Sequence, residues 1–548
     1  MNSVRDKQNP KIVLVATPGV LLRWKEDGKN ICGVRTNEPK LTQHVVKTML
    51  EKGLREEFSA IKPKIDVIDM KMMAPEREEK YSEVAYGYRT IEKYRLGASF
   101  GDVKGQINDA NIIGLTCNFT QEARVVADFA KFARQENPNA FIIVGGSDAM
   151  ARPEYFLNNG ADAVVLGEGE KIGHKLIAAW AGELKFEDVS GIAYKENGMT
   201  RIHPRRVSVI PQPSDFVFPA FYSPLLKEYN ESSEGVTPDW VRKDGYLMSI
   251  ETSRGCNNAC SFCTTPALRG RYRAMPLEQE IELLKHYKKY GVKTLLEWED
   301  NRLARLSLPN GRDEVLAAFQ TRRDMGFFWE FSNGLEIGRL VKEDESIDKE
   351  LIRTLYKFDF EKMRGCFRAY TPLESVRHDG SEPLYKKLKP WELEKEILRE
   401  IVRAGVPVLT IGLIIGIPSE TKETLELTYK RCEEIKRLVE EENKRKEGTG
   451  KAETYAVFTL FLDIPLPGSP GYIKFSKEGR IKYDINKHPE LWNFYTGVLK
   501  GDVFSPEEMT KIREEIATKL NGKEATELWD IRGKYPYPFG NPIGEGSM

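Results

Sequence analysis

The chain has 548 residues, of which 40% are hydrophobic and 30% are charged. This composition is typical of a globular protein, and the length predicts two or three domains because single cores rarely grow so large. The 83 basic and 83 acidic residues cancel, which argues against a strongly basic nucleic-acid-binding protein, so we expect no nucleic-acid partner.

The first eleven residues are polar and charged, and they lack the apolar core of a secretory signal. No apolar run approaches the length of a transmembrane helix. From these two observations we expect a cytoplasmic protein without a membrane segment.

Residues 11–166 alternate between apolar runs and helical patterns. Continuous apolar strands separated by helices predict an α/β domain with a doubly wound, Rossmann-like parallel sheet, which we assign to residues 1–184. The expected strands cover residues 11–16, 65–70, 111–116, 140–144 and 161–166, and the expected helices cover residues 42–52 and 121–135.

Glycines follow two of these strands, in the runs Gly145-Gly146-Ser147 and Gly167-Glu168-Gly169-Glu170. In doubly wound sheets, ligands bind beyond the carboxyl ends of the strands, and glycine lets the backbone approach a large ligand closely. Tight strand-to-helix turns also need glycine, so these runs alone leave both interpretations open.

Residues 185–244 have a mixed composition. A short strand-like run lies at residues 191–194, and a proline-bearing run extends from Pro204 to Pro219. We expect a linker here that wraps the junction between two domains.

The run from Ser253 to Cys263 places three cysteines as Cys256-x3-Cys260-x2-Cys263. Three thiolates on one loop can hold three irons of a 4Fe-4S cluster and leave the fourth iron open. A structural zinc site needs four ligands, and the nearest histidines are the distant His203 and His286. Seven cysteines in the whole chain are too few for a disulfide framework.

Strand and helix patterns alternate again from residue 245. They predict a partial (β/α)6 barrel over residues 245–480, followed by a small, mostly helical C-terminal cap over residues 481–548. The expected strands cover residues 246–251, 292–298, 327–331, 365–371, 406–415 and 455–464, and the expected helices cover residues 276–290, 347–358, 391–404 and 506–520.

Phe262, which stands between the last two cysteines, completes a pattern that resembles the radical S-adenosylmethionine (SAM) superfamily. The runs Glu297–Asn301, Tyr370–Ser375, Ile414–Thr421 and Pro465–Pro470 resemble family segments at the barrel rim. The resemblance implies that Cys256, Cys260 and Cys263 ligate the cluster. It implies SAM contacts by Phe262, Glu299, Asp300, Ser332, Glu374 and Gly416.

The two glycine runs, placed in this order before the cysteine loop, resemble the cobalamin-binding domain of B12-dependent radical SAM enzymes. The Asp-x-His-x-x-Gly motif of other cobalamin proteins is absent, and His44 and His174 lie in no such context. The resemblance implies cobalamin without a histidine ligand, although a sheet domain that has lost its ligand is an alternative. The implied cobalamin contacts are Thr116, Asn118, Gly145, Gly146, Ser147, Gly167, Glu168 and Gly169.

The resemblance implies a methyltransferase. One SAM would give a 5'-deoxyadenosyl radical that takes hydrogen from an unactivated carbon, and methylcobalamin would supply the methyl group. The electron would come from an external reductant of the flavodoxin or ferredoxin type. The methyl acceptor is a peptide or protein side chain or a small molecule, and the long linker and the cap favour a peptide or protein.

Two other functions stay open. The first is a radical SAM enzyme of the same architecture that rearranges, cyclises or epimerises its substrate, and the second is a cobalamin and iron-sulfur binding protein without turnover. A methylthiotransferase is less favoured, because its first domain would need three more cluster cysteines and residues 1–200 contain only Cys32 and Cys117.

Overall fold

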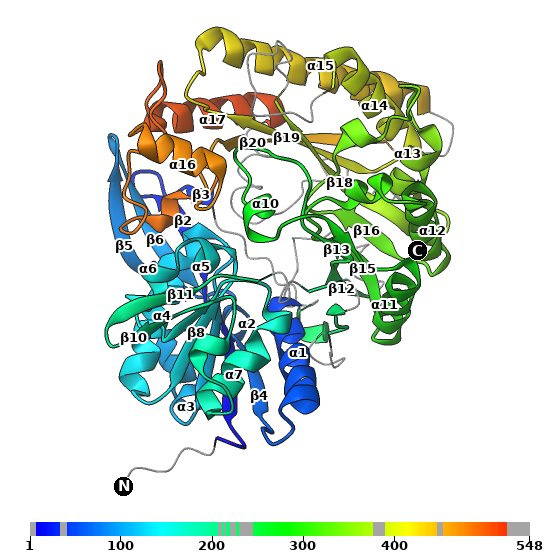
Figure 1. Cartoon of the computed structure of the whole chain (residues 1–548). Coiled ribbons are helices and arrows are strands. Elements are labelled where there is room, and N and C mark those ends of the chain that lie inside the picture. Colours follow the sequence, from blue (N-terminus) through cyan, green and yellow to red (C-terminus); the bar gives the residue numbers. More distant parts are fainter. Residues whose placement is uncertain are drawn as a thin grey trace.

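The computed structural model of the chain describes residues 7–32, 41–206, 211–212, 215–219, 226–229, 245–375, 389–446 and 453–522. Two largely parallel sheets dominate it, one in the blue-to-cyan half of the chain and one in the green-to-orange half (Figure 1). No helix among the described residues combines the length and the apolar composition needed to cross a membrane.

The first sheet has helices on both faces. Ile12 and Leu14 of β1 pack with α1 and α7, while Val13 and Val15 pack with α3 and α4. Because successive strand residues point to opposite faces, one apolar run fills two cores. The parallel order is β4 (Lys64–Asp69), β1 (Lys11–Ala16), β7 (Ile112–Thr116), β8 (Phe141–Gly145) and β9 (Ala163–Val165). The helices are α1 (Leu41–Glu57), α3 (Lys104–Ile107), α4 (Ala123–Glu136) and α7 (Gly173–Ala181). The predicted doubly wound sheet is confirmed.

Two further strands extend this sheet beyond the expected domain end. β10 (Ile192–Glu196) pairs antiparallel with β9, and β11 (Met199–His203) pairs antiparallel with β10. Residues 192–203 were expected in a linker and instead form a hairpin on the first domain. The strand-like run at residues 191–194 was visible in the sequence, but Lys195, Glu196 and Arg201 interrupt the apolar pattern, so the pairing of two strands was not predicted.

The second sheet is a partial barrel of six parallel strands, as predicted. Among the described residues its end strands, β12 and β20, do not pair with each other, so the barrel stays open. The order is β12 (Tyr246–Ile250), β15 (Val292–Glu297), β16 (Phe328–Phe331), β18 (Arg364–Glu374), β19 (Val408–Ile415) and β20 (Tyr455–Leu462), with the short β17 (Phe358–Asp359) antiparallel to β18. The helices between them are α11 (Leu277–Lys289), α12 (Gly311–Asp324), α13 (Lys349–Tyr356), α14 (Trp391–Ala404) and α15 (Lys422–Lys446).

A third, antiparallel sheet was not predicted. Its charged strands alternate only weakly, so their sequence is typical of solvated surface. The strand order is β3 (Asn30–Cys32), β2 (Gly19–Trp24), β6 (Arg89–Leu96) and β5 (Glu78–Tyr86). Its buried residues, among them Leu22 and Ile91, belong to the same core as the barrel. This sheet therefore joins the N-terminal part of the chain to the second domain.

The third sheet packs against the C-terminal segment of the chain. The hydroxyl groups of Tyr86 and Thr510 share a hydrogen bond of 2.7 Å, and Trp24 Nε1 donates to Glu514 Oε1 at 3.1 Å. Both partners lie on α17 (Pro506–Asn521), which also packs against β20. The helix expected over residues 506–520 is thus present, and residues 523–548 of the expected cap lie outside the described residues.

Candidate active site between the two domains

The cysteine loop follows β12, the first barrel strand. Gly255 has a φ of +82°, and a side chain there would clash with the backbone oxygen of Arg271. Only glycine tolerates both conditions. The loop is pinned further by Asp300, whose Oδ2 accepts from Gly255 N at 2.7 Å. The backbone is therefore fixed directly before Cys256.

Cys256, Cys260 and Cys263 line one cavity of about 360 Å³, which we call the cysteine cavity. Cys256 Sγ accepts from Asn258 N at 3.4 Å and from Asn301 Nδ2 at 3.5 Å. N–H donors aimed at sulfur suit a thiolate that carries negative charge. Burial raises the pKa of the Cys263 thiol, so a bound metal would be needed to hold it as a thiolate.

The described residues contain no group of three or more His, Cys, Asp or Glu side chains arranged to hold one metal ion. The three thiols on one fixed loop are compatible with a 4Fe-4S cluster.

Three of the six predicted SAM residues line the cysteine cavity. They are Phe262, Asp300 and Glu374. Glu374 has a φ of +61°, which is a strained conformation for a glutamate at the end of β18. The carboxylates in this wall suit a ligand that carries an ammonium and a sulfonium group.

Glu299 does not line the cysteine cavity. It lies under the cysteine loop, where it accepts from Thr252 N at 3.0 Å and from the Ser253 hydroxyl. Burial raises the pKa of Glu299 to about 7. Its place in the structure is therefore that of a buried support for the loop, and the adjacent Asp300 faces the cavity instead.

Ser332 and Gly416 also lie outside the lining of the cysteine cavity. Ser332 Oγ donates to Glu330 at 2.9 Å, and Gly416 N donates to Glu420 at 2.9 Å. Asn333, which follows Ser332, and Ile414, two residues before Gly416, line the cavity in their place.

Several lining residues were missed by the sequence analysis. Asn301 and Asn333 directly follow Asp300 and Ser332, which were predicted to contact SAM. The consecutive polar residues after β15 and after β16 could therefore all have been predicted to line the site. Phe494 carries no sequence signal, because it follows no strand of the barrel. The lining residues that the sequence analysis missed altogether include Phe461, Asp463 and Phe494, whereas Asn301, Asn333 and Tyr370 lie in or beside the predicted rim runs without being assigned as SAM contacts.

A second cavity, of about 590 Å³, lies between the first sheet and the barrel, and we call it the interdomain cavity. Its lining includes all eight residues predicted to contact cobalamin, which are Thr116, Asn118, Gly145, Gly146, Ser147, Gly167, Glu168 and Gly169. Within the part of the chain that the structure describes, no histidine side chain contributes to this lining.

The lining of the interdomain cavity changes from glycine turns at the rim to apolar side chains deeper in the first domain. Gly146 has a φ of +101°, and a side chain there would clash with the Cys117 carbonyl. This turn keeps the backbone at the open edge of the sheet. Deeper in the domain the walls are apolar, with Ile12, Leu14, Leu50, Ile112 and Ile177. The residues present are compatible with a corrin.

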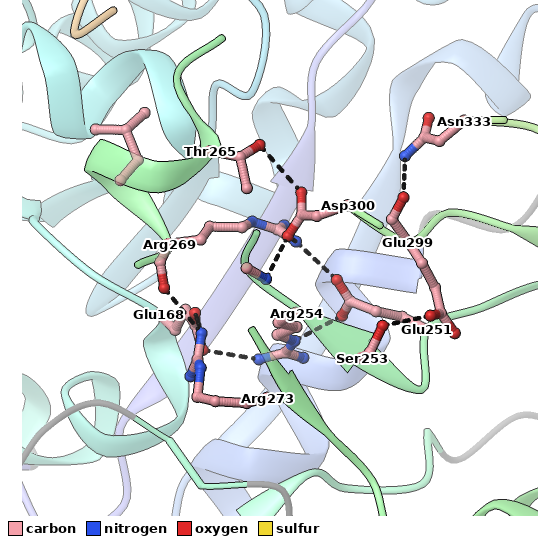
Figure 2. A network of polar contacts seen from close by, with 12 residues as sticks. Glu168, Glu251, Ser253, Arg254, Thr265, Arg269, Arg273, Glu299, Asp300 and Asn333 are labelled. Atoms are coloured by element: carbon pink, nitrogen blue, oxygen red, sulfur yellow. Dashed lines mark hydrogen bonds and ion pairs between the residues drawn. The ribbon is translucent and has the colours of Figure 1, made fainter. Parts of the chain in front are cut away.

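A buried ion network joins the walls of this cavity (Figure 2). Arg254 Nη1 lies 2.6 Å from Glu170 and 3.2 Å from Glu168, and its Nε lies 2.7 Å from Glu251. Arg273 bonds the other oxygen of Glu168 at 2.6 Å. Burial lowers the pKa of Arg254, but the carboxylates of Glu170, Glu251 and Glu168 together raise it well above its usual value.

The network continues to the cysteine loop. Arg269 Nη1 lies 2.8 Å from Glu251 and 3.3 Å from Asp300, which in turn holds Gly255. Glu168, predicted to contact cobalamin, thus also binds the two arginines that flank the cysteines. The network ties the glycine turn of the first domain to the loop of the second.

The two cavities meet. Four residues belong to both linings, and we call them the junction residues: Thr265, Asp300, Asn333 and Phe494. A molecule at the junction would contact ligands in both cavities at once.

Comparisons with known proteins agree with this arrangement. The family model of the B12 binding domain matches residues 106–176, and that of the radical SAM superfamily matches residues 250–432. The uncharacterized methyltransferase PH0819 of Pyrococcus horikoshii is 28% identical over 350 residues, which cover 62% of this chain and 67% of that protein.

A second relative is the cytidylyl-2-hydroxyethylphosphonate methyltransferase of Streptomyces wedmorensis. It is 24% identical over 375 residues, which cover 62% of this chain and 65% of that protein. The chain thus spans about two thirds of each relative.

Among solved structures, the cobalamin-dependent SAM radical enzyme OxsB, with aqua-cobalamin and SAM bound, is similar with a TM-score of 0.63. The sequences are 17% identical, and the match covers 94% of this chain and 68% of OxsB. The two domain families of this chain account for the three predicted cofactors, cobalamin, SAM and a 4Fe-4S cluster. The chain therefore combines a B12-binding domain with a radical SAM domain and has the fold of the cobalamin-dependent radical SAM enzymes.

Proposed function

We propose that the chain is a cobalamin-dependent radical SAM methyltransferase that methylates an unactivated carbon. The observation that carries this proposal is the contact between the two cavities at the junction residues. Methyl transfer to a carbon radical needs the radical source and the methyl donor at one point. When bound, the cluster and SAM supply a carbon radical, and cobalamin supplies the methyl group.

The chain's own residues hold these groups and orient them. Cys256, Cys260 and Cys263 would ligate three irons. Asp300 and Glu374 would accept hydrogen bonds from SAM, and Phe262 would pack beside it, because all three line the cysteine cavity. The other three predicted SAM residues, Glu299, Ser332 and Gly416, would not contact SAM themselves in this proposal and could affect its binding only by positioning neighbouring residues.

The glycine turns would carry the corrin. The backbone at Gly145, Gly146 and Gly167 forms the rim of the interdomain cavity, with Thr116 and Asn118 beside it. Arg254 does not bind the corrin in this proposal. It fixes the distance between the turn and the cysteine loop through Glu168 and Glu170.

Burial of the network keeps water from the reacting groups. Arg254 is 8% exposed, and Glu299 beneath the loop is 2% exposed. Charged side chains that are buried away from water do not have to reorganise during the reaction. They can therefore hold the turn and the cysteine loop in place without slowing the reaction.

A peptide or protein side chain is the acceptor that we propose. A groove of about 810 Å³ beside the interdomain cavity supports this choice, since Pro467 lines both. Its walls come from α4, from residues 151–159 and from the segment after β20, and they include Arg152, Tyr155 and Tyr472. A chain lying in this groove could place one side chain at the junction.

The proposal includes an external one-electron reductant of the flavodoxin or ferredoxin type and a cytoplasmic location, where reducing conditions protect an exposed iron. The proposal also keeps the predicted domain boundaries at residues 1–184, 185–244, 245–480 and 481–548. The one change is that the β10–β11 hairpin, which falls in the second of these segments, is counted to the first domain.

The test is anaerobic reconstitution with iron, sulfide and hydroxocobalamin, followed by incubation with methyl-labelled SAM, a chemical reductant and peptides from a proteome digest. Stoichiometric corrin beside about four irons per chain, together with label in peptide carbon, supports the proposal. Iron without corrin, or 5'-deoxyadenosine without labelled product, contradicts methyl transfer and favours a non-methylating radical SAM enzyme. Label only in small metabolites contradicts the peptide acceptor alone.

A further inference from the structure

Phe494 occupies an unusual place in the site. It belongs to the C-terminal segment, just after the short 3-10 helix Pro489–Leu491, yet its side chain lines both the cysteine cavity and the interdomain cavity. The other three junction residues, Thr265, Asp300 and Asn333, belong to the barrel. Phe494 is therefore the contribution of the C-terminal segment to the junction.

The backbone of Phe494 is strained. Its φ is +70°, a left-handed conformation that an aromatic residue rarely adopts. The surroundings impose it, because Phe494 O accepts from Leu462 N at 2.8 Å. The buried Asn493 also accepts from Tyr495 N at 2.8 Å and from Thr496 N at 3.0 Å. Strain that the fold holds at a cavity wall points to a function for the side chain.

The junction has an aromatic wall. Phe461 packs edge-on against Phe494 with ring centroids 5.9 Å apart, and against Tyr370 at 6.5 Å. Tyr370 can lie in the cavity wall because Gly334 and Gly412 leave room for its ring, where any side chain would clash with it. Three rings set at steep angles offer both faces and edges to another ring.

The side chains around the junction disfavour an anionic group of the acceptor there. The cysteine cavity is lined by Asp300, Glu336, Glu374 and Asp463 and, among the described residues, by no Lys, Arg or His. Among the described residues, the cations that line the interdomain cavity are Arg254 and Arg269. Both are paired with carboxylates at 2.6–2.8 Å. Among the described residues, a phosphate or carboxylate at the junction would therefore meet acidic side chains and no Lys, Arg or His that is not already paired with a carboxylate.

We propose that Phe494 is a specificity-determining residue that holds an uncharged or cationic aromatic group of the acceptor at the junction. This inference rests on the proposed methyl transfer and adds the chemical class of the acceptor. It excludes phosphorylated and other anionic groups from the reacting position. With a peptide acceptor, the methylated residue is aromatic.

The test uses a matched pair of probes, N-acetyl-L-tyrosine amide and N-acetyl-O-phospho-L-tyrosine amide, with N-acetyl-L-leucine amide as the aliphatic comparison. Dissociation constants are measured by equilibrium dialysis on reconstituted holoenzyme with SAM bound and no reductant. Phe494→Ala removes the ring. Phe494→Gly removes it and also relieves the backbone strain, so it serves if the alanine variant does not fold.

Phe504→Ala is the control variant. Phe504 is half-buried in the same C-terminal segment and lines neither cavity. Its substitution removes a similar amount of packing but should leave the binding of all three probes unchanged.

The tyrosine probe should bind wild-type holoenzyme at least about 10-fold more tightly than the phosphorylated probe, and Phe494→Ala or Phe494→Gly should weaken it by about 10-fold. The tyrosine and leucine probes should then bind alike. Equal or tighter binding of the phosphorylated probe, no binding of the tyrosine probe, or no effect of either variant overturns the inference.

Failure of the inference can be told apart from failure of the proposed function. Corrin content and the transfer of labelled methyl are measured on the same preparations. A preparation that retains corrin and methylates an anionic acceptor refutes the role of Phe494 and keeps the methyltransferase. A preparation without corrin refutes the proposed function.

Discussion

Arg254 and Glu170 form an ion pair with 2.6 Å between Nη1 and Oε1, and this pair joins the two cofactor domains. Arg254 stands two residues before the first cysteine of the loop, and Glu170 ends the Gly-Glu-Gly-Glu turn of the first domain. Both side chains are at least nine-tenths buried. Movement of the turn would therefore be transmitted to the cysteine loop.

Arg254→Gln should destabilise the protein strongly. It leaves Glu168, Glu170 and Glu251 without one of their cations, and removing one partner of a buried pair costs about 3–5 kcal/mol. The measurement is the free energy of unfolding of the cluster-free protein in urea. Lys511→Gln breaks an exposed pair with Glu515, and its cost should stay below about 1 kcal/mol. Similar values for the two variants would refute the buried network.

Cys256→Ala should abolish cluster assembly, because two thiolates cannot hold the cube in place. The iron content after anaerobic reconstitution should fall from about four per chain to nearly none. Cys432→Ala is the matched control, since Cys432 is a fully buried cysteine on α15 away from the loop. It should keep its iron. Full iron content in Cys256→Ala would rule out this loop as the cluster site.

Gly146→Ala should distort the turn at the rim of the interdomain cavity. The positive φ and the clash with the Cys117 carbonyl both oppose a side chain, so we expect a stability loss of more than about 1 kcal/mol and weaker corrin binding. Gly105→Ala provides the contrast, because its Cβ would meet no atom within 4 Å.

Gly105 lies in the short helix α3, where alanine is favoured over glycine. Its replacement should stabilise the protein by about 0.5–1 kcal/mol. Thermal unfolding and a corrin-binding titration distinguish the two variants. Equal corrin affinity in both would remove Gly146 from the proposed cobalamin site.

His44 should make the protein less stable in mild acid. Burial, with a smaller contribution from Lys47, lowers the pKa of His44 from 6.5 to about 4. Between these values the unfolded chain binds the proton and the folded chain does not, so stability falls as the pH drops from about 6.5 towards 4. The expected loss from this histidine between pH 7.5 and pH 5 is about 2 kcal/mol.

The comparison is between wild-type protein and His44→Gln, both without cluster, in urea at these two pH values. Carboxylates contribute equally to both proteins, so the difference reports His44. The substitution should flatten the pH dependence by about 2 kcal/mol. An unchanged pH dependence would mean that His44 titrates alike in the folded and unfolded chains.

The sequence by itself determined the cysteine loop, the two parallel sheets and the glycine turns. Each depends on residues that are close in the chain. Three cysteines within eight positions must lie together whatever the rest of the fold, and a continuous apolar run between helices can be buried only in a parallel sheet. The eight cobalamin contacts were implied by the resemblance to B12-dependent radical SAM enzymes, and all eight line the interdomain cavity.

The sequence could not decide between Glu299 and Asp300, which are neighbours at the end of β15. Successive side chains there point in different directions, and the fold buries Glu299 under Thr252 and Ser253 while Asp300 faces the cysteine cavity. The antiparallel sheet was missed for a related reason. Val84, Tyr86 and Ile91 of its charged strands are buried only because α17 and the barrel core cover them.

Only the tertiary structure decided how the two halves of the chain meet. The pairing of Arg254 with Glu170 and the place of Phe494 at the junction join residues far apart in sequence, and no local spacing encodes such contacts. They follow from the packing of whole helices and strands, because the position of each side chain depends on how all the elements around it pack together. The sequence therefore indicated the cofactor chemistry, and the fold determined where the acceptor meets it.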